Sequence, residues 1–373
     1  MRLDAFTERV MRKNKSNQSR LPLTISAQYG LVDQITFFNK VVASTDLSNY
    51  YLLKKGEFAY NKSYSSDYPW GAIKRLDNYD QGALSSLYIC FAPQDNVVSD
   101  FILQYFESPK WHKGISEIAV EGARNHGLLN VAVQDFFHTY HYVPKDKKEQ
   151  IKISKLLMLL DERISTQNKI IEDLKKLKSA IIEIEYTPNT KNTSPIGDVI
   201  EQISKRNKNN AIQNVLSVSN RQGFIKQSDQ FENRNVASED TSNYKIVEQN
   251  DFAFNPARIN VGSIARLTTF EKGIVSPMYV CFRTQENVAP EYIDYFFESK
   301  HFYCEIQKRL EGSVRQCLSF EGLCNIPLSL PSFEIQQRIG KRIFTLGQKI
   351  KMETDLLELL NKQKQYLLRQ MFI

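Results

Sequence analysis

The sequence predicts an α+β protein with a pseudo-twofold internal repeat, in which two long antiparallel coiled-coil helices join two mixed α/β domains. One observation is a stretch without Pro or Gly, residues 149–185, in which apolar side chains recur at three- and four-residue steps. The other is that the second half of the chain repeats the first, helix included. We therefore expect mixed domains at 1–143 and 187–330, and long helices at 144–186 and 331–373.

Composition allows a DNA-binding role without requiring one. The 373 residues carry 49 Lys and Arg against 42 Asp and Glu, a net charge of +7 that suits a nucleic-acid partner. No apolar run approaches the ~18 residues of a membrane span, and the charged N-terminus does not resemble a signal peptide, so we expect a cytoplasmic location. The five cysteines are interpreted as buried, reduced thiols.

Each mixed domain alternates short β-rich runs with turns. The runs LPLTI and SLYICF occur in the first copy, and VLSVS and PMYVCF in the second. One amphipathic helix is predicted next, at about 99–119 and again at about 290–311. Its aromatic side chains are expected in the core.

The repeat has a period of about 185 residues and extends through both domains and both helices. Its last block, 150–186 against 336–372, aligns without gaps. The earlier matching blocks are 6–15 with 199–208, 23–34 with 216–227, 42–61 with 236–255, 85–91 with 276–282, 105–108 with 296–299, and 121–124 with 311–315.

The two long helices carry matching apolar stripes. Such a helix spans roughly 50 Å at 1.5 Å per residue. Polar residues interrupt both stripes at equivalent places, Gln167 with Glu353 and Lys178 with Lys364, and a polar residue in an apolar seam fixes register. Because a whole domain separates the helices in the chain, we expect them to pair antiparallel. The predicted interface residues are Ile153, Leu157, Leu160, Ile164, Ile171, Leu174, Ile181, Ile339, Ile343, Leu346, Ile350, Leu357, Leu360 and Leu367.

No catalytic or metal-binding pattern is convincing. An adenine methyltransferase needs an Asn/Asp-Pro-Pro-aromatic turn, but in FNPAR at 254–258 the second Pro is Ala257 and the aromatic position is Arg258, so a strand-end turn is predicted. His138 and His141 have no third ligand within reach by sequence, and a solvated loop is the preferred interpretation. There is no Gly-rich phosphate loop. We therefore predict a non-catalytic chain without a metal site.

Binding is the remaining function, and DNA is the preferred ligand. DNA readout uses Arg and Lys for phosphate and guanine, and Asn and Gln for adenine. The candidate DNA-binding residues lie in presumed loops where the two copies differ. They are Arg12, Lys13, Lys15, Arg20, Lys74, Arg75, Arg124 and Asn125 in the first copy, and Lys205, Arg206, Lys208, Arg221, Arg258, Arg315 and Gln316 in the second.

The stretch EGSVRQCLSFEGLCNIPLSLPSFEIQQRI and the helix end KQKQYLLRQMF resemble the specificity subunit of type I restriction-modification systems, as does YVPKDKKEQIKI. The resemblance covers essentially the whole chain. It implies that each target-recognition domain reads one half of a bipartite double-stranded DNA site, while the helix pair sets the spacing. It also implies two docked modification (methyltransferase) subunits and added restriction (motor-nuclease) subunits, with S-adenosylmethionine, ATP and Mg on those partners and no cofactor on this chain.

The sequence departs from the common family pattern at both helix starts. Only Pro144 remains of the usual Pro-Leu-Pro-Pro run, and Ile335-Gln336 stands in place of Glu-Gln. Two alternatives stay open. One is the DNA-reading half of a fused enzyme, against which the absence of a second catalytic block argues. The other is a coiled-coil scaffold with two β-rich ligand-binding domains and no nucleic acid.

Overall fold

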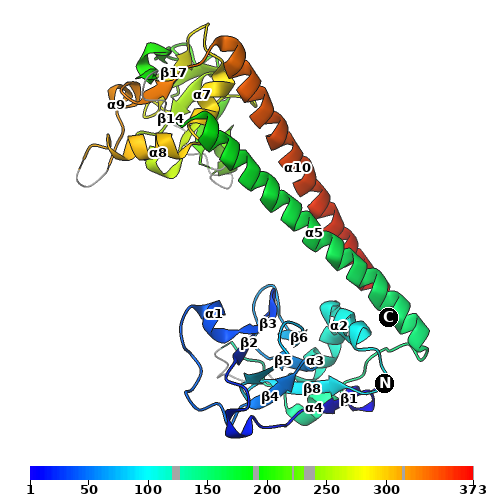
Figure 1. The fold of residues 1–373 in the computed structure, drawn as a ribbon. Coiled ribbons are helices and arrows are strands. Elements are labelled where there is room, and N and C mark those ends of the chain that lie inside the picture. Colours follow the sequence, from blue (N-terminus) through cyan, green and yellow to red (C-terminus); the bar gives the residue numbers. More distant parts are fainter. Residues whose placement is uncertain (120–126, 188–192, 221, 231–239, 313–315, 373) are drawn as a thin grey trace. The chain divides into compact units, whose positions relative to one another are not determined.

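The computed structural model describes residues 1–119, 127–187, 193–220, 222–230, 240–312 and 316–372 (Figure 1). They form two compact units. Unit 1 is Met1–Asn168 with Asp355–Ile373, and unit 2 is Lys169–Thr354. Both units mix helices and strands, so the predicted α+β class is confirmed.

Unit 1 contains two four-stranded sheets. One is antiparallel in the order β1-β8-β5-β6, and the other has the order β3-β2-β7-β4 with β2 and β7 parallel. The elements before the first long helix are η1 (Leu3–Ala5), β1 (Thr7–Arg9), η2 (Lys15–Asn17), β2 (Pro22–Ser26), β3 (Gly30–Asp33), α1 (Gln34–Phe38), β4 (Tyr51–Lys54), β5 (Phe58–Asn61), β6 (Ala72–Arg75), β7 (Gln81–Leu84), β8 (Ile89–Pro93), α2 (Ser99–Glu107), η3 (Pro109–Trp111), α3 (His112–Ile118) and α4 (Val133–His138).

Unit 2 repeats both sheets strand for strand, as β10-β17-β14-β15 and β12-β11-β16-β13, and adds the pair β18-β9. Its elements between the long helices are β9 (Thr193–Pro195), η4 (Ile196–Asp198), β10 (Ile200–Ile203), β11 (Val215–Ser219), β12 (Gly223–Lys226), α6 (Gln227–Gln230), β13 (Lys245–Glu248), β14 (Phe252–Phe254), η5 (Ile259–Val261), β15 (Ile264–Arg266), β16 (Lys272–Val275), β17 (Val280–Thr284), α7 (Pro290–Phe296), α8 (Lys300–Gln307), α9 (Phe320–Cys324) and β18 (Pro327–Ser329).

The repeat extends to single contacts within the sheets. Gly82 and Gly273 are equivalent, and a Cβ atom at either would lie 2.4 Å from a leucine Cδ1 atom, that of Leu23 or Leu216. Only glycine therefore allows this leucine to pack against the central strand in each unit.

Two apolar cores stabilise unit 1. One contains residues of both sheets, among them Leu23, Leu53 and Cys90. The other joins the antiparallel sheet to α2 and to the ends of the long helices, where Phe91 and Leu157 are fully buried. Unit 2 has the corresponding two clusters.

The cysteine prediction is only partly correct. Cys90 and Cys281 are buried on equivalent strands, and burial raises the pKa of each thiol to about 12, which keeps it protonated. Cys304, however, is exposed, and Cys317 and Cys324 are half-buried. The buried interpretation is therefore wrong for Cys304, because its position on α8 faces solvent.

The prediction of one continuous amphipathic helix at 99–119, and again at 290–311, is wrong. In both copies the helix is interrupted in the middle. Ser108 and Ser299 are extended, with ψ of 161° and 150°, and each begins a new helical turn. The Ser299 hydroxyl accepts a hydrogen bond from the Phe302 amide at 3.2 Å, and the Ser108 hydroxyl one from the Lys110 amide at 3.3 Å. These side chains act as N-caps, which favour a new helix over continuation of the old one.

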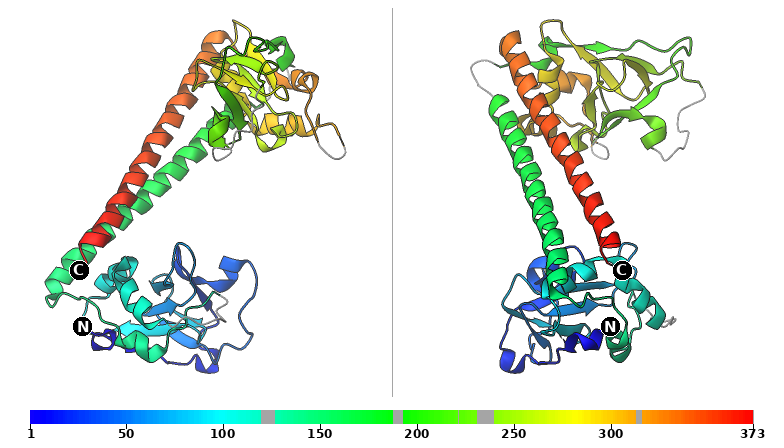
Figure 2. Two further views of the ribbon diagram at one scale, coloured as in Figure 1. Left: turned by 180° about the vertical axis from the view of Figure 1, so that it is seen from behind. Right: turned by 90° about the vertical axis from the view of Figure 1, so that its right-hand side faces the viewer.

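The long helices form as predicted. They are α5 (Lys147–Glu185) and α10 (Phe333–Gln370), each a single uninterrupted helix (Figures 1 and 2). In unit 1, Asp161 of α5 pairs with Lys364 of α10 at 2.5 Å. Leu157, one turn earlier in α5, is in the same cluster as Leu368, one turn later in α10, so the segments run antiparallel. In unit 2, Glu185 pairs with Arg342 at 3.1 Å.

A buried glutamine fastens each long helix to its unit. The Gln150 side chain accepts from the Val98 amide at 2.7 Å, and donates to the Pro144 carbonyl at 2.7 Å. Gln336 does the same with the Ala289 amide at 2.9 Å and the Pro331 carbonyl at 2.8 Å. Val98 and Ala289 are the N-cap residues of α2 and α7, so each glutamine ties a helix N-terminus to the long helix.

His141 lies in the aromatic core of unit 1, so its predicted place in a solvated loop is wrong. It is 3% exposed, and its ring nitrogens lie 3.0 Å from the Tyr105 hydroxyl and 2.7 Å from the Thr139 hydroxyl. Burial, together with the nearby N-terminal charge, lowers the pKa of His141 to about 4.

This shift predicts that unit 1 loses stability in mild acid. A histidine with a lowered folded pKa binds its proton more readily when unfolded, so stability present above about pH 6.5 is lost as the pH falls towards 4. Between pH 7.5 and pH 5 the loss is on the order of 2 kcal/mol. Both tryptophans, Trp70 and Trp111, lie in unit 1, so urea unfolding followed by their fluorescence measures this unit.

His141→Gln provides the comparison, because glutamine does not titrate. We expect its unfolding free energy to change less than that of the wild type between the two pH values. An equal loss in both proteins would show that other groups cause the acid sensitivity.

Candidate nucleic-acid interface

The basic segment of each unit lies along the edge strand of the mixed sheet. In unit 1 the Leu52 amide of β4 donates to the Arg12 carbonyl at 2.8 Å. In unit 2 the Ile246 amide of β13 donates to the Lys205 carbonyl at 2.8 Å. The two basic clusters found in the sequence therefore occupy the same place in the two copies of the fold.

A buried asparagine closes the loop that follows. Asn14 is fully buried, and its amide donates to the Ser19 carbonyl at 2.9 Å while its oxygen accepts from the Ser19 amide at 2.8 Å. Asn207 does the same with Ile212, at 2.9 and 3.1 Å. Because these side chains are occupied inside the loop, their role is to shape it.

Sequence reasoning missed this pair, although a signal existed. Asn14 and Asn207 are identical at aligned positions, whereas the two residues before them differ between the copies. An unchanged asparagine in a divergent basic loop is typical of a loop-closing residue.

In unit 1 the loop cations differ in how far they are already occupied. Arg12 pairs with Glu57 at 2.6 Å. The Lys13 ammonium donates to the Asn49 carbonyl at 2.7 Å and lies 4.6 Å from the centre of the Tyr51 ring. Lys15 and Arg20 are exposed.

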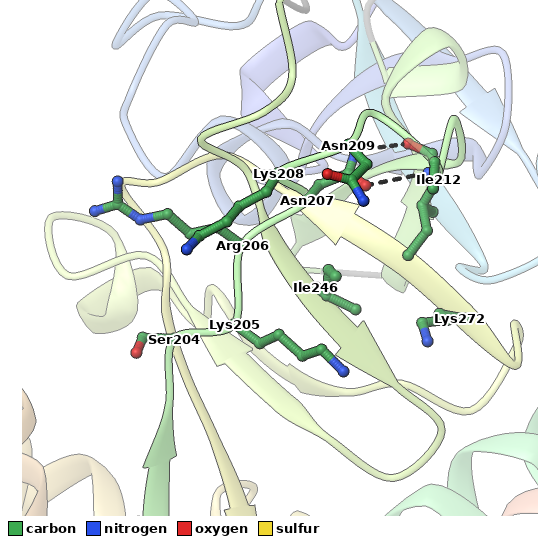
Figure 3. A pocket seen from close by; sticks show the side chains of 10 residues that line it. Ser204, Lys205, Arg206, Asn207, Lys208, Asn209, Ile212, Ile246 and Lys272 are labelled. Carbon is green, nitrogen blue, oxygen red and sulfur yellow. Dashed lines mark hydrogen bonds between the residues drawn. The ribbon is translucent and has the colours of Figure 1, made fainter.

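In unit 2 the loop surrounds an open basic pocket of about 740 Å³ (Figure 3). Lys205, Arg206 and Lys208 are exposed there. Lys272 of β16, which was not predicted, completes the lining. The lining residues are Ser204, Lys205, Arg206, Asn207, Lys208, Asn209, Ala211, Ile212, Ile246 and Lys272.

Lys74 and Arg75 hold β6 against α2. Lys74 pairs with Glu107 at 2.6 Å, and Arg75 with Asp100 at 2.7 Å. Arg266 of β15 takes the equivalent place in unit 2 and pairs with Glu291 of α7. These cations have a structural role in both copies, and DNA contact by Lys74 or Arg75 stays a prediction.

The remaining candidates lie in loops. The strand-end turn predicted at 254–258 is confirmed, since the Arg258 amide donates to the Asn255 carbonyl at 3.0 Å. Arg258 and Gln316 are exposed. Four other candidates lie outside the described residues: Arg124, Asn125, Arg221 and Arg315.

The predicted seam residues of the long helices are buried or half-buried. The buried ones are Leu157, Leu160, Ile171, Ile339, Ile343 and Leu360, and the half-buried ones are Ile153, Ile164, Leu174, Ile181, Leu346, Ile350, Leu357 and Leu367. The polar interruptions also lie on this face. Gln167 is buried, Lys178 pairs with Glu298 at 2.6 Å, and Glu353 pairs with Lys349.

The described part of the chain contains no group of three or more His, Cys, Asp or Glu side chains able to hold a metal ion. It also contains no helix that is both long and apolar enough to span a membrane.

A family model described as the type I restriction modification DNA specificity domain matches residues 188–362. Over these residues the chain is similar to a type I restriction-modification specificity domain. The resemblance predicted from the sequence is therefore confirmed, and so is the role in DNA sequence recognition that it implies. The alternative of a scaffold without nucleic acid is not favoured.

Solved structures support the fold over the full length. The S subunit of a type I restriction-modification system from M. genitalium matches with a TM-score of 0.57 and 15% identity, over 100% of this chain and 95% of that one. A chain from a study of complex assembly and conformational transition of the type I system matches with a TM-score of 0.56 and 14% identity, over 99% and 95%. At these identities the likeness concerns the fold alone. The search of curated proteins gave no match.

Proposed function

We propose that this chain is the DNA sequence-recognition subunit of a type I restriction-modification complex, and that each unit reads one half of a bipartite site. The observation that carries the proposal is the specificity-domain match at 188–362, combined with the repetition of the same two sheets in unit 1. In both units a buried asparagine closes a basic loop at the sheet edge, which supports two reading surfaces of common origin. Divergent cations around a shared loop are what two different half-sites would require.

The long helices set the spacing of the half-sites and dock the partners in this proposal. Each helix belongs partly to unit 1 and partly to unit 2, so its length is shared by both. Both helices also expose apolar side chains away from the seam, a feature typical of protein interfaces. They are Ile151, Leu156, Met158, Leu159, Ile170, Leu177 and Ile184 on α5, and Phe333, Phe344, Met352, Leu359 and Tyr366 on α10.

The chemistry belongs to the partners. Two modification subunits dock on the helices and use S-adenosylmethionine, and restriction subunits join with ATP and Mg. The chain itself is non-catalytic and acts in the cytoplasm as part of this assembly. The described residues offer cations, amides and apolar helix faces, which are groups suited to binding.

A domain exchange tests whether each unit reads one half of the DNA site. Residues 1–143 are replaced by the matching segment of another specificity subunit, and the methylome of a host carrying the complex is sequenced. We expect one half of the methylated motif to change and the other half to stay. A change in both halves, or the absence of a two-part adenine motif in the wild type, would contradict the proposal.

A further inference from the structure

The basic pocket of unit 2 is complementary in charge and polarity to a sugar–phosphate strand. In Figure 3 the side chains of Lys205 and Lys272 lie on the same side of Ile246. The side chains of Arg206 and Lys208 extend together in another direction. Ala211, Ile212 and Ile246 supply an apolar lining, and no carboxylate lines the pocket.

The amide of Asn207 is not available for base reading. Its donor and its acceptor are both used by Ile212. Lysine carries a compact point charge suited to phosphate, and three of the four cations that line the pocket are lysines. The pocket therefore matches the backbone of DNA better than the edge of a base.

The acidic residue that follows the edge strand of the mixed sheet, Glu57 in unit 1 and Asp251 in unit 2, is paired differently in the two units. In unit 1 Glu57 holds Arg12, the counterpart of Lys205. In unit 2 the counterpart of Glu57 is Asp251, and Arg283 engages its two oxygens at 3.0 and 3.1 Å. Lys205 is therefore not drawn into that ion pair, and it remains exposed in the pocket.

Lys272, the fourth cation that lines the pocket, has no charged counterpart in unit 1. Lys272 corresponds to Gln81 in unit 1. It pairs with Glu248 at 2.8 Å, and this carboxylate, which also lies near Lys205, is not part of the pocket lining. Glu248 lowers the net charge of this side of the pocket, while its contact fixes the direction of the Lys272 ammonium.

We propose that this pocket of unit 2 is a backbone-anchoring site that binds the phosphodiesters of one DNA strand around a deoxyribose, and that unit 1 lacks the equivalent site. The inference rests on the proposed function, because it takes DNA as the ligand. Its consequence is that the salt dependence of DNA binding is concentrated in unit 2.

The test is a salt titration of DNA binding by the full chain in complex with its modification subunits. Each phosphate contact contributes roughly 0.9 to the slope of log affinity against log salt. We expect Lys205→Gln/Lys272→Gln to reduce the steepness of this slope by about 1 to 2, and to lower affinity several-fold at low salt. The methylated motif stays the same, because the backbone carries no base identity.

Matched variants keep the result interpretable. Lys300→Gln/Lys308→Gln removes the same charge at the two ends of α8 in the same unit and should leave the slope unchanged. Lys205→Arg/Lys272→Arg keeps the charge and should keep the slope. DNA with neutral methylphosphonate linkages in the unit 2 half-site should bind the wild type and the Gln variant equally.

Each contrary outcome has a distinct meaning. An unchanged slope in the Gln variant, or an altered methylation motif, overturns the backbone site while the recognition function stands. Equal slope losses in the Lys300/Lys308 control assign the effect to general charge and also overturn it. If the wild-type complex does not bind DNA, the proposed function itself fails.

Discussion

Gln150→Ala is expected to lower the unfolding free energy of unit 1 by about 2–3 kcal/mol, since a buried amide and a carbonyl both lose their partner. Gln150 is 1% exposed, and it joins the Val98 amide at the start of α2 to the Pro144 carbonyl before α5. Alanine is too short to reach either group. The measurement is urea unfolding followed by tryptophan fluorescence, because Trp70 and Trp111 both belong to unit 1.

The repeat supplies the internal control. Gln336→Ala should produce the same damage in unit 2, where it is seen in the far-ultraviolet circular dichroism but leaves the tryptophan transition in place. Lys152→Ala, an exposed position on α5, should change neither signal by more than about 0.5 kcal/mol. If Gln150→Ala unfolds like the wild type, the glutamine contacts do not hold the helix to the unit.

Asn207→Ala should weaken DNA binding by the complex by about tenfold, equivalent to about 1.4 kcal/mol. The Asn207 side chain bonds both the amide and the carbonyl of Ile212, so it holds the loop that presents Lys205, Arg206 and Lys208. Without it the loop must be ordered when DNA binds, and that ordering costs affinity. The measurement is fluorescence anisotropy of the cognate site with the modification subunits present.

The loss of DNA affinity should be confined to one half-site. Asn207→Ala should weaken binding to DNA that carries only the half-site assigned to unit 2 by the domain exchange, and Asn14→Ala should weaken binding to DNA that carries only the other half-site. Asn78→Ala and Asn220→Ala remove one exposed asparagine from each unit and should bind as the wild type does. Equal loss of both half-sites from one substitution would contradict separate reading loops.

The sequence predicted the parts of the site that depend on local pattern. The basic clusters were visible as composition, and they do lie at equivalent sheet edges in the two units. Which cations are already occupied was not visible, since their partners are distant in the chain. Arg12 meets Glu57, Lys74 meets Glu107, and Lys272 enters the pocket from a different strand.

By itself the sequence determined the internal repeat, the two long helices and the resemblance to the family, because each follows from periodicity or from comparing residues. The tertiary structure decided which polar side chains are structural and which face a ligand. Gln150 and Asn14 look like ordinary surface residues in the sequence, yet each satisfies buried backbone groups. That distinction depends on burial and on contacts between distant segments, so it arises only when the chain folds.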